Sequence, residues 1–348
     1  MLKQWCLYII CGFLFSCDNT IDIDADFTEQ MYVYGLLDDS DSMQSLRIQK
    51  SFLQSGVSPY DLVGDYQNIY YQPDEISVEV EEWKDNILLR SWNLEVINGD
   101  TIGILKDKGL FASSPNILYR FNAQLDKYAQ YKFIAVNNIT GLITTAETKL
   151  VDSFAVLFPT VSIPGFDFTD AGEIYYLCRY AVNARLYDLK MRLYYQEVNI
   201  ESGEATDEYI DWTIFKNIIG DNMLGTGIIA YGINANAFYN FVAAVLEPNA
   251  EVTREFQKII YTFYAGGEEM YLHYINLMAN INITSQYAFS MYSNIENGNG
   301  LFSSIYTREL PDMIISAESI DTLACGRLTG NLGFKSSPSN PAYPECSE

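Results

Sequence analysis

Short segments in which apolar and polar residues alternate recur through the first half of the chain, and this period of two constrains the fold more than any other feature. In the clearest segment, Ile76, Val78 and Val80 alternate with serine and glutamate, and a Lys-Asp-Asn turn follows at residues 84–86. Such alternation predicts antiparallel strands with one face on the core and the other in water. The expected strands are 31–37, 45–52, 76–81, 87–96, 119–121, 131–136 and 143–150.

Seven short strands separated by turn signals predict an immunoglobulin-like antiparallel β-sandwich, which we assign to residues 31–158. Proline and glycine interrupt the strand pattern between Pro159 and Gly165, so we expect the seam between two domains there. The chain has 348 residues, which is long enough for two domains that each have a core of their own.

Residues 159–348 predict a second β-rich domain that carries one or two packed helices. In residues 235–246, four apolar side chains fall at the i, i+3, i+4 and i+7 positions of a helix face. A shorter helix is expected near residues 268–279, after a pair of glycines. The expected strands of this domain are 174–181, 184–198, 209–219 and 255–264.

The start of the chain has the pattern of a bacterial lipoprotein signal. Lys3 is followed by eleven residues without charge from Trp5 to Phe15, and the small Ser16 precedes Cys17. Because a membrane span takes about 20 apolar residues, we interpret residues 1–16 as a signal peptide whose removal leaves Cys17 as the lipid-bearing N-terminus. Residues 17–30 are acidic and predict a solvated tether between the lipid anchor and the folded part. The alternative is an ordinary secretory signal with a chance cysteine.

The charge of the chain argues against nucleic acid as a partner. The formal net charge is −24, and lysine and arginine do not cluster in the sequence. A phosphate backbone would be repelled by such a chain unless the fold gathered a basic patch. The 27 tyrosines suit half-buried strands and wet recognition surfaces alike.

Three cysteines remain after the predicted signal peptide and lipid site. Cys325 and Cys346 enclose 20 residues rich in glycine, serine and proline, and we predict a disulfide between them. Cys178 lies in an apolar run and is expected to be a buried thiol. A metal site made of the three cysteines is the alternative, but no CxxC spacing supports it.

No catalytic or cofactor-binding constellation stands out in the sequence. His273 is the only histidine, so a multi-histidine metal site is excluded and a catalytic triad would have to use this one residue. Two acidic pairs, Glu81-Glu82 and Glu268-Glu269, could serve a glycosidase only if two carboxylates faced each other across a cleft. We therefore predict no catalytic residue, no metal and no cofactor.

A tyrosine-rich insertion at residues 54–73 is too long for a hairpin loop. Its residues Tyr60, Tyr66, Tyr70 and Tyr71 are candidates for a partner contact, because tyrosine combines a large contact area with a polar tip. The alternative is that these rings fold back and cover an open side of the sandwich.

Three further segments carry a resemblance. Residues 34–38 (Tyr-Gly-Leu-Leu-Asp), 264–269 (Tyr-Ala-Gly-Gly-Glu-Glu) and 292–304, together with the lipid site, resemble a family of uncharacterised Bacteroidota surface lipoproteins. The resemblance implies a place in the outer membrane, often beside TonB-dependent transporters, and it supplies no established activity or functional residues. Within the last segment, the Asn-Gly-Asn-Gly run at 297–300 predicts a tight turn with positive φ.

Two functions from different classes are therefore expected. The first is a non-enzymatic binding or scaffold lipoprotein of the cell surface, held to the outer membrane by its lipid. Its partner would be a TonB-dependent transporter, another envelope protein or a glycan. The second is a carboxylate-based glycan hydrolase at the cell surface.

Overall fold

The computed structural model describes residues 28–52, 57–160, 165–169, 172–282, 291–341, 343 and 346. The fold is mainly β, as predicted, with three sheets and a few helices. No helix in these ranges is long and apolar enough to cross a membrane. The helices are α2 (Pro59–Leu62), α3 (Tyr66–Ile69), the 3-10 helix η1 (Gly99–Ile102), α4 (Asn236–Val245), α5 (Glu268–Asn282) and α6 (Ala317–Cys325).

The largest sheet has eight strands in the order β12-β11-β14-β15-β1-β2-β6-β5. Its strands are β1 (Met31–Asp38), β2 (Met43–Lys50), β5 (Glu95–Asn98), β6 (Ile117–Asn122), β11 (Ala184–Asn199), β12 (Ala205–Ile219), β14 (Val252–Gly267) and β15 (Gly298–Met313). The four-stranded sheet contains β4 (Ile87–Asn93), β3 (Ile76–Lys84), β7 (Gln130–Asn137) and β8 (Ile143–Lys149) in that order. The three-stranded sheet contains β13 (Ile228–Asn234), β10 (Glu173–Arg179) and β9 (Val156–Phe158).

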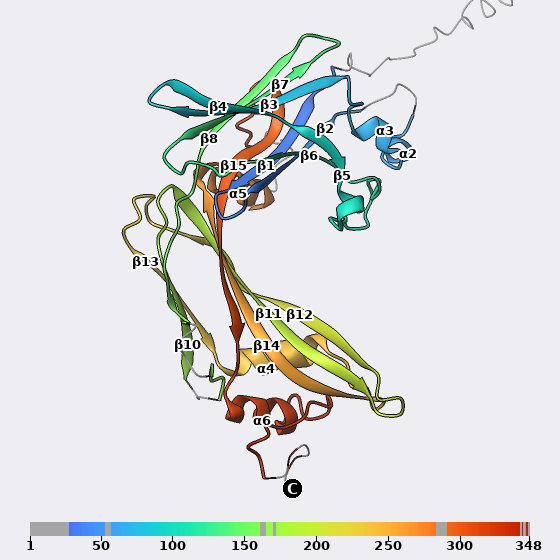
Figure 1. Cartoon of the computed structure of the whole chain (residues 1–348), viewed down its shortest axis with the longest axis vertical. Coiled ribbons are helices and arrows are strands. Elements are labelled where there is room, and N and C mark those ends of the chain that lie inside the picture. The colour runs from blue at the N-terminus through green and yellow to red at the C-terminus, as the bar shows by residue number, and fades with distance from the viewer. Residues whose placement is uncertain are drawn as a thin grey trace, which may run out of the picture.

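These elements form two lobes (Figure 1). The first lobe contains β1 to β8 with α2, α3 and η1, and the second contains β9 to β14 with α4 and α6. Strand β15 runs through both, because its first half pairs in parallel with β1 and its second half pairs antiparallel with β14. One continuous sheet therefore ties the lobes together.

Each lobe has its own hydrophobic core. In the first lobe the large sheet faces the four-stranded sheet. The ring centroids of Phe302 on β15 and Phe133 on β7 are 5.8 Å apart. The first core takes its buried residues from the chain between Met31 and Leu150, and adds Ile295 and Phe302. The second core begins at Val151 and includes residues of β10, β11, β14, α4 and α6. The late segment of the chain thus completes both cores.

The run at 297–300 differs from its prediction. Asn297 has a φ of +54° and makes the turn, but Gly298 already begins β15. Gly300 has a φ of +116° inside that strand, and a Cβ built on it would lie 2.0 Å from the carbonyl oxygen of Val33. The run is therefore the start of a strand that packs tightly on β1, and not a hairpin turn.

Cys178 is a free thiol on β10, buried in the second core. Burial raises the pKa of this thiol to about 12. Since alkylating reagents attack the thiolate, we expect iodoacetamide to leave Cys178 unmodified in the native protein at pH 8 and to modify it in denaturant. Mass spectrometry of the two samples checks this. Equal modification of both samples would contradict the buried position.

Candidate functional site

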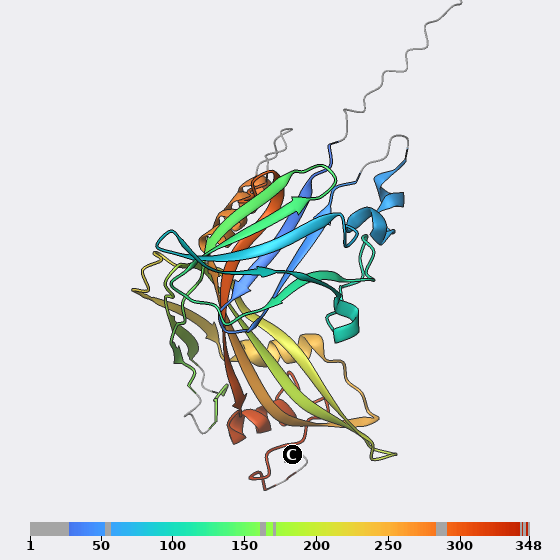
Figure 2. The same ribbon diagram turned by 45° about the horizontal axis from the view of Figure 1, so that its top comes forward.

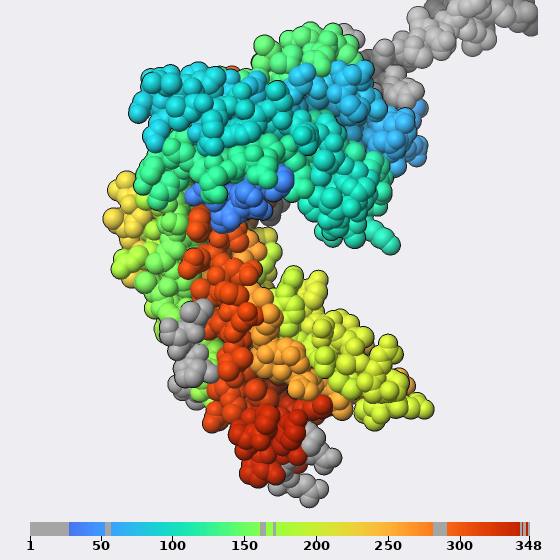
Figure 3. Space-filling model, viewed as in Figure 1, coloured from blue at the N-terminus to red at the C-terminus, as the bar shows by residue number. Residues whose placement is uncertain are grey.

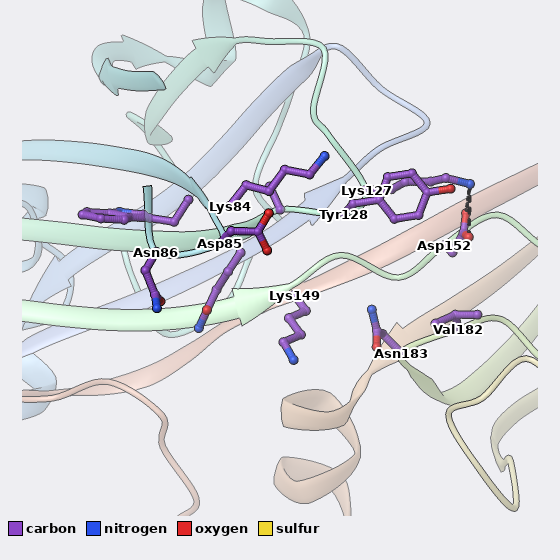
Figure 4. A pocket seen from close by; sticks show the side chains of 12 residues that line it. Lys84, Asp85, Asn86, Lys127, Tyr128, Lys149, Asp152, Val182 and Asn183 are labelled. Atoms are coloured by element: carbon purple, nitrogen blue, oxygen red, sulfur yellow. Dashed lines mark hydrogen bonds and ion pairs between the residues drawn. The ribbon is translucent and has the colours of Figure 1, made fainter. Parts of the chain in front are cut away.

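A cavity of about 440 Å³ opens where the two lobes meet (Figure 4). The first lobe supplies the β3–β4 turn, the segment that leads into β7 and the end of β8. The segment between β8 and β9 adds Asp152, and the chain between β10 and β11 adds Val182 and Asn183. The lining residues are Trp83, Lys84, Asp85, Asn86, Lys127, Tyr128, Ala129, Gln130, Lys149, Asp152, Val182 and Asn183. Segments up to about a hundred residues apart in the sequence thus form one site.

The β3–β4 turn places one wall of the cavity. Asp85 and Asn86 have φ angles of +52° and +62°, the left-handed conformation that a two-residue hairpin turn requires. Aspartate and asparagine tolerate this conformation better than most residues. The turn predicted at residues 84–86 is therefore confirmed, and it presents an ammonium, a carboxylate and an amide to the cavity.

Two ion pairs fix the charged side chains of the cavity. Lys84 Nζ lies 2.9 Å from Asp126 Oδ2, and Lys127 Nζ lies 2.9 Å from Asp152 Oδ1. The hydrogen bond from Lys84 lowers the pKa of Asp126. Burial raises the pKa of Asp152, but the hydrogen bonds from Lys127 and Ser153 and the charge of Lys127 together outweigh burial, so that this pKa is also lowered. Both pairs therefore stabilise the site above the ordinary carboxyl pKa, and they break as the pH falls through the lowered values.

Tyr128 is an exposed aromatic ring held between these ion pairs. The residue is 71% exposed, while its backbone N–H donates to Asp126 Oδ1 over 3.0 Å. Lys127 Nζ and Lys84 Nζ lie 5.1 Å and 5.5 Å from the ring centroid, within the range of cation–π attraction. The ring is thus both accessible and fixed in position, as a stacking platform must be.

Lys149 stands among the other lining residues at the end of β8 (Figure 4). Within the described ranges, no carboxylate lies within 4.0 Å of its Nζ atom, so its ammonium is available to a ligand. The amides beside it are oriented: Asn183 Nδ2 donates to the Leu150 carbonyl over 2.8 Å, and Gln130 Nε2 donates to Glu147 Oε2 over 2.8 Å. The side-chain oxygen of each amide can still accept a hydrogen bond.

The acidic pairs considered in the sequence have other partners. Glu81 and Glu82 are consecutive on β3 and so point to opposite faces. Glu82 is buried, binds Arg90 and accepts a 2.7 Å hydrogen bond from the Tyr131 hydroxyl. Neither carboxylate of this pair can therefore face the other across a cleft.

The second pair lies at the start of α5. A smaller cavity of about 230 Å³ adjoins the first and is lined by Glu147, Glu268 and Glu269 as well as by Lys149. Glu269 Oε2 accepts hydrogen bonds from Ser303 Oγ at 2.7 Å and Thr148 Oγ1 at 3.2 Å. This carboxylate thus ties α5 to β15 and β8.

The only histidine also has a local partner. His273 Nδ1 lies 3.3 Å from the carbonyl oxygen of Tyr292. In the part of the chain that the structure describes, no three His, Cys, Asp or Glu side chains are arranged to hold a metal ion.

The four candidate tyrosines divide between core and surface. Tyr70 and Tyr71 are buried, 2% and 5% exposed, and Tyr71 belongs to the first core. Burial excludes these two from a surface contact and matches the alternative in which the rings cover the sandwich. Tyr60 on α2 and Tyr66 on α3 are exposed. The predicted partner contact is therefore narrowed to Tyr60 and Tyr66.

Two predictions concern cysteines: the disulfide between Cys325 and Cys346, and the lipid on Cys17. Cys325, the last residue of α6, forms a disulfide with Cys346, as predicted. Cys17 and the predicted signal peptide lie outside the described residues, so the lipid anchor stays a prediction.

Comparisons with known proteins give only distant likenesses among solved structures. A scan against protein-family models finds no match, and neither does a search of curated protein sequences. Among solved structures, the chain is similar to a crystal structure of the C-terminal globular domain of an oligosaccharyltransferase from Pyrococcus abyssi, with 9% sequence identity and a TM-score of 0.25. The match covers 66% of this chain and 45% of the chain it matches.

Proposed function

We propose that this protein is a non-enzymatic cell-envelope lipoprotein that acts as a binding module and holds a glycan in the cavity between its lobes. The observation that carries the proposal is Tyr128, an exposed ring fixed between two ion pairs in a cavity lined by hydrogen-bonding side chains. A pyranose ring has an apolar face that stacks on such a ring, and hydroxyl groups at its rim that need donors and acceptors.

The balance of charges in the cavity supports a polyhydroxylated ligand. Three of the twelve lysines of the chain line it, and Asp85 and Asp152 line it too. Ammonium groups donate hydrogen bonds, carboxylates accept them, and amides do both. The volume of about 440 Å³ falls in the range of about 300–1,000 Å³ that small-ligand sites occupy.

The proposed location follows from the sequence. A lipid on Cys17 would hold the protein in the outer membrane, and residues 17–30 would carry the folded part at the cell surface beside a TonB-dependent transporter. The first lobe, with its two facing sheets, would be the immunoglobulin-like scaffold of this module. Its partners would then be the membrane, the transporter and the glycan.

A carboxylate-based glycan hydrolase is the second candidate. It is favoured by one observation, the three glutamates Glu147, Glu268 and Glu269 that line the smaller cavity. Glu269 is already held by Ser303 and Thr148, which suits a structural role. Chromatography of oligosaccharides after long incubation separates the two functions, because shortened products would contradict a purely binding role.

Tyr128→Ala is expected to lower glycan affinity by roughly tenfold, because it removes the stacking platform and leaves the fold intact. Isothermal titration with oligosaccharides released from the cell envelope measures the effect. Tyr60→Ala is the matched control, since Tyr60 is 72% exposed and is not among the residues that line the cavity. Equal affinities of the Tyr128 and Tyr60 variants, or no binding by the wild type, would overturn the proposal.

A further inference from the structure

A second surface of the first lobe exposes large apolar side chains in one place. The loop around η1 carries Ile102, Leu105, Leu110 and Phe111, all exposed, and the neighbouring insertion carries the exposed Tyr60 and Tyr66. Figures 1 and 2 show the η1 loop and helices α2 and α3 along the same side of this lobe. We call these six side chains the apolar patch. Single exposed apolar residues are ordinary, but a contiguous group marks an interaction surface.

Hydrogen bonds hold the patch in shape. The Ala112 N–H donates to the Val63 carbonyl over 2.9 Å and so joins the η1 loop to the insertion. The buried Asn116 donates from Nδ2 to the Ile104 carbonyl over 2.9 Å. Lys106 Nζ donates to the Ala112 carbonyl over 2.9 Å, so this cation is turned into the loop. The apolar side chains are thus exposed by an ordered loop.

The described part of the chain starts at Thr28, next to the root of the insertion that carries Tyr60 and Tyr66. The Gln30 N–H donates to Ser51 Oγ and the Ser51 N–H donates to the Gln30 carbonyl, each over 2.8 Å, at the root of the insertion. Thr28 is eleven positions after Cys17 in the sequence, with ten residues between them. A chain of that length spans at most about 40 Å when fully extended. A lipid on Cys17 would therefore keep the membrane within reach of the patch.

We propose that the apolar patch docks on the lipid surface in which the protein is anchored. The proposal rests on the lipid anchor of the proposed function, and it identifies the partner of Tyr60 and Tyr66 as lipid. Leucine, isoleucine and phenylalanine enter the boundary between headgroups and acyl chains, to a depth of about 5–10 Å in interfacial segments. Tyrosine favours the headgroup level, where its ring is buried and its hydroxyl stays hydrated. Docking would fix the orientation of both lobes relative to the membrane. Figure 3 shows that the yellow-green end of the second lobe reaches out on the same side of the molecule as the blue and teal segments of the first lobe.

The test uses the lipidated protein with Leu105→Cys, labelled at that cysteine with the fluorophore NBD and reconstituted on vesicles of phosphatidylethanolamine and phosphatidylglycerol. The control is Leu224→Cys, because Leu224 is also a leucine, is 75% exposed against 74% for Leu105, and lies between β12 and β13 in the other lobe. The buried Cys178 and the disulfide do not take the label. We expect spin-labelled lipid to quench the label at position 105 several-fold more than the label at position 224.

Each other outcome overturns the proposal in a distinguishable way. If the protein floats with the vesicles but the label is quenched equally at the two positions, the lipid docking of the patch is contradicted and the lipid anchor is retained. If the protein does not float with the vesicles, both the lipid docking of the patch and the lipid anchor are contradicted. A label at position 105 that is shielded only after envelope proteins are added identifies a protein, and not lipid, as the partner.

Discussion

Gly300→Ala is expected to lower the free energy of unfolding by about 3 kcal/mol or more, because it combines backbone strain with a steric clash at the strand that joins the lobes. The φ of +116° at Gly300 is one that side-chain-bearing residues rarely adopt. A Cβ there would lie 2.0 Å from the Val33 carbonyl oxygen, which is backbone and cannot turn away. The strands must therefore separate where β15 pairs with β1.

Urea denaturation, monitored by circular dichroism, measures this loss in the free energy of unfolding. Gly141→Ala is the matched control, since Gly141 also has a positive φ, +74°, but has open space where a Cβ would lie. The control should lose only about 1 kcal/mol, the cost of the backbone conformation. Similar midpoints for the two variants would show that β15 does not pack against β1 at this point.

Replacing Cys325 and Cys346 together with serine is expected to lower the free energy of unfolding by about 3 kcal/mol, because the bridge restricts a loop of 20 residues in the unfolded chain. The loop is also part of the second core, through Leu332 and Phe334. Arg254, buried and paired with Glu197 at 2.7 Å, donates to the Leu332 carbonyl over 2.7 Å. Loosening the loop therefore weakens a buried ion pair as well.

Thermal denaturation with and without dithiothreitol tests the bridge without a further substitution. The reductant should lower the melting temperature of the wild type towards that of the double variant, and should leave the double variant unchanged. A wild-type melting temperature that does not respond to the reductant, and equals that of the variant, would contradict the role of the bridge.

Elements whose signal is local could be predicted from the amino-acid sequence. Strands β3, β7 and β8 alternate with a period of two, and helix α4 has apolar residues on one face, so each pattern is complete within about ten residues. The 84–86 turn and the Cys325–Cys346 pair are local in the same sense. A mainly β fold with a few helices could be predicted from these patterns alone.

Features that depend on distant segments of the chain became visible only in the folded structure. Strand β15 begins with Gly-Asn-Gly, which predicts a turn, yet it is a strand because β1, more than 260 residues earlier in the chain, pairs with it. Tyr70 is buried and Tyr60 exposed, although both lie in one tyrosine-rich insertion, because only the packing of that segment on the sandwich distinguishes them. The cavity gathers Lys84, Tyr128 and Lys149 from three segments with no shared motif. A local pattern of residues indicates which secondary structure the backbone prefers. Which side chains are buried, and which come together in a site, depends on contacts between segments that lie far apart in the sequence.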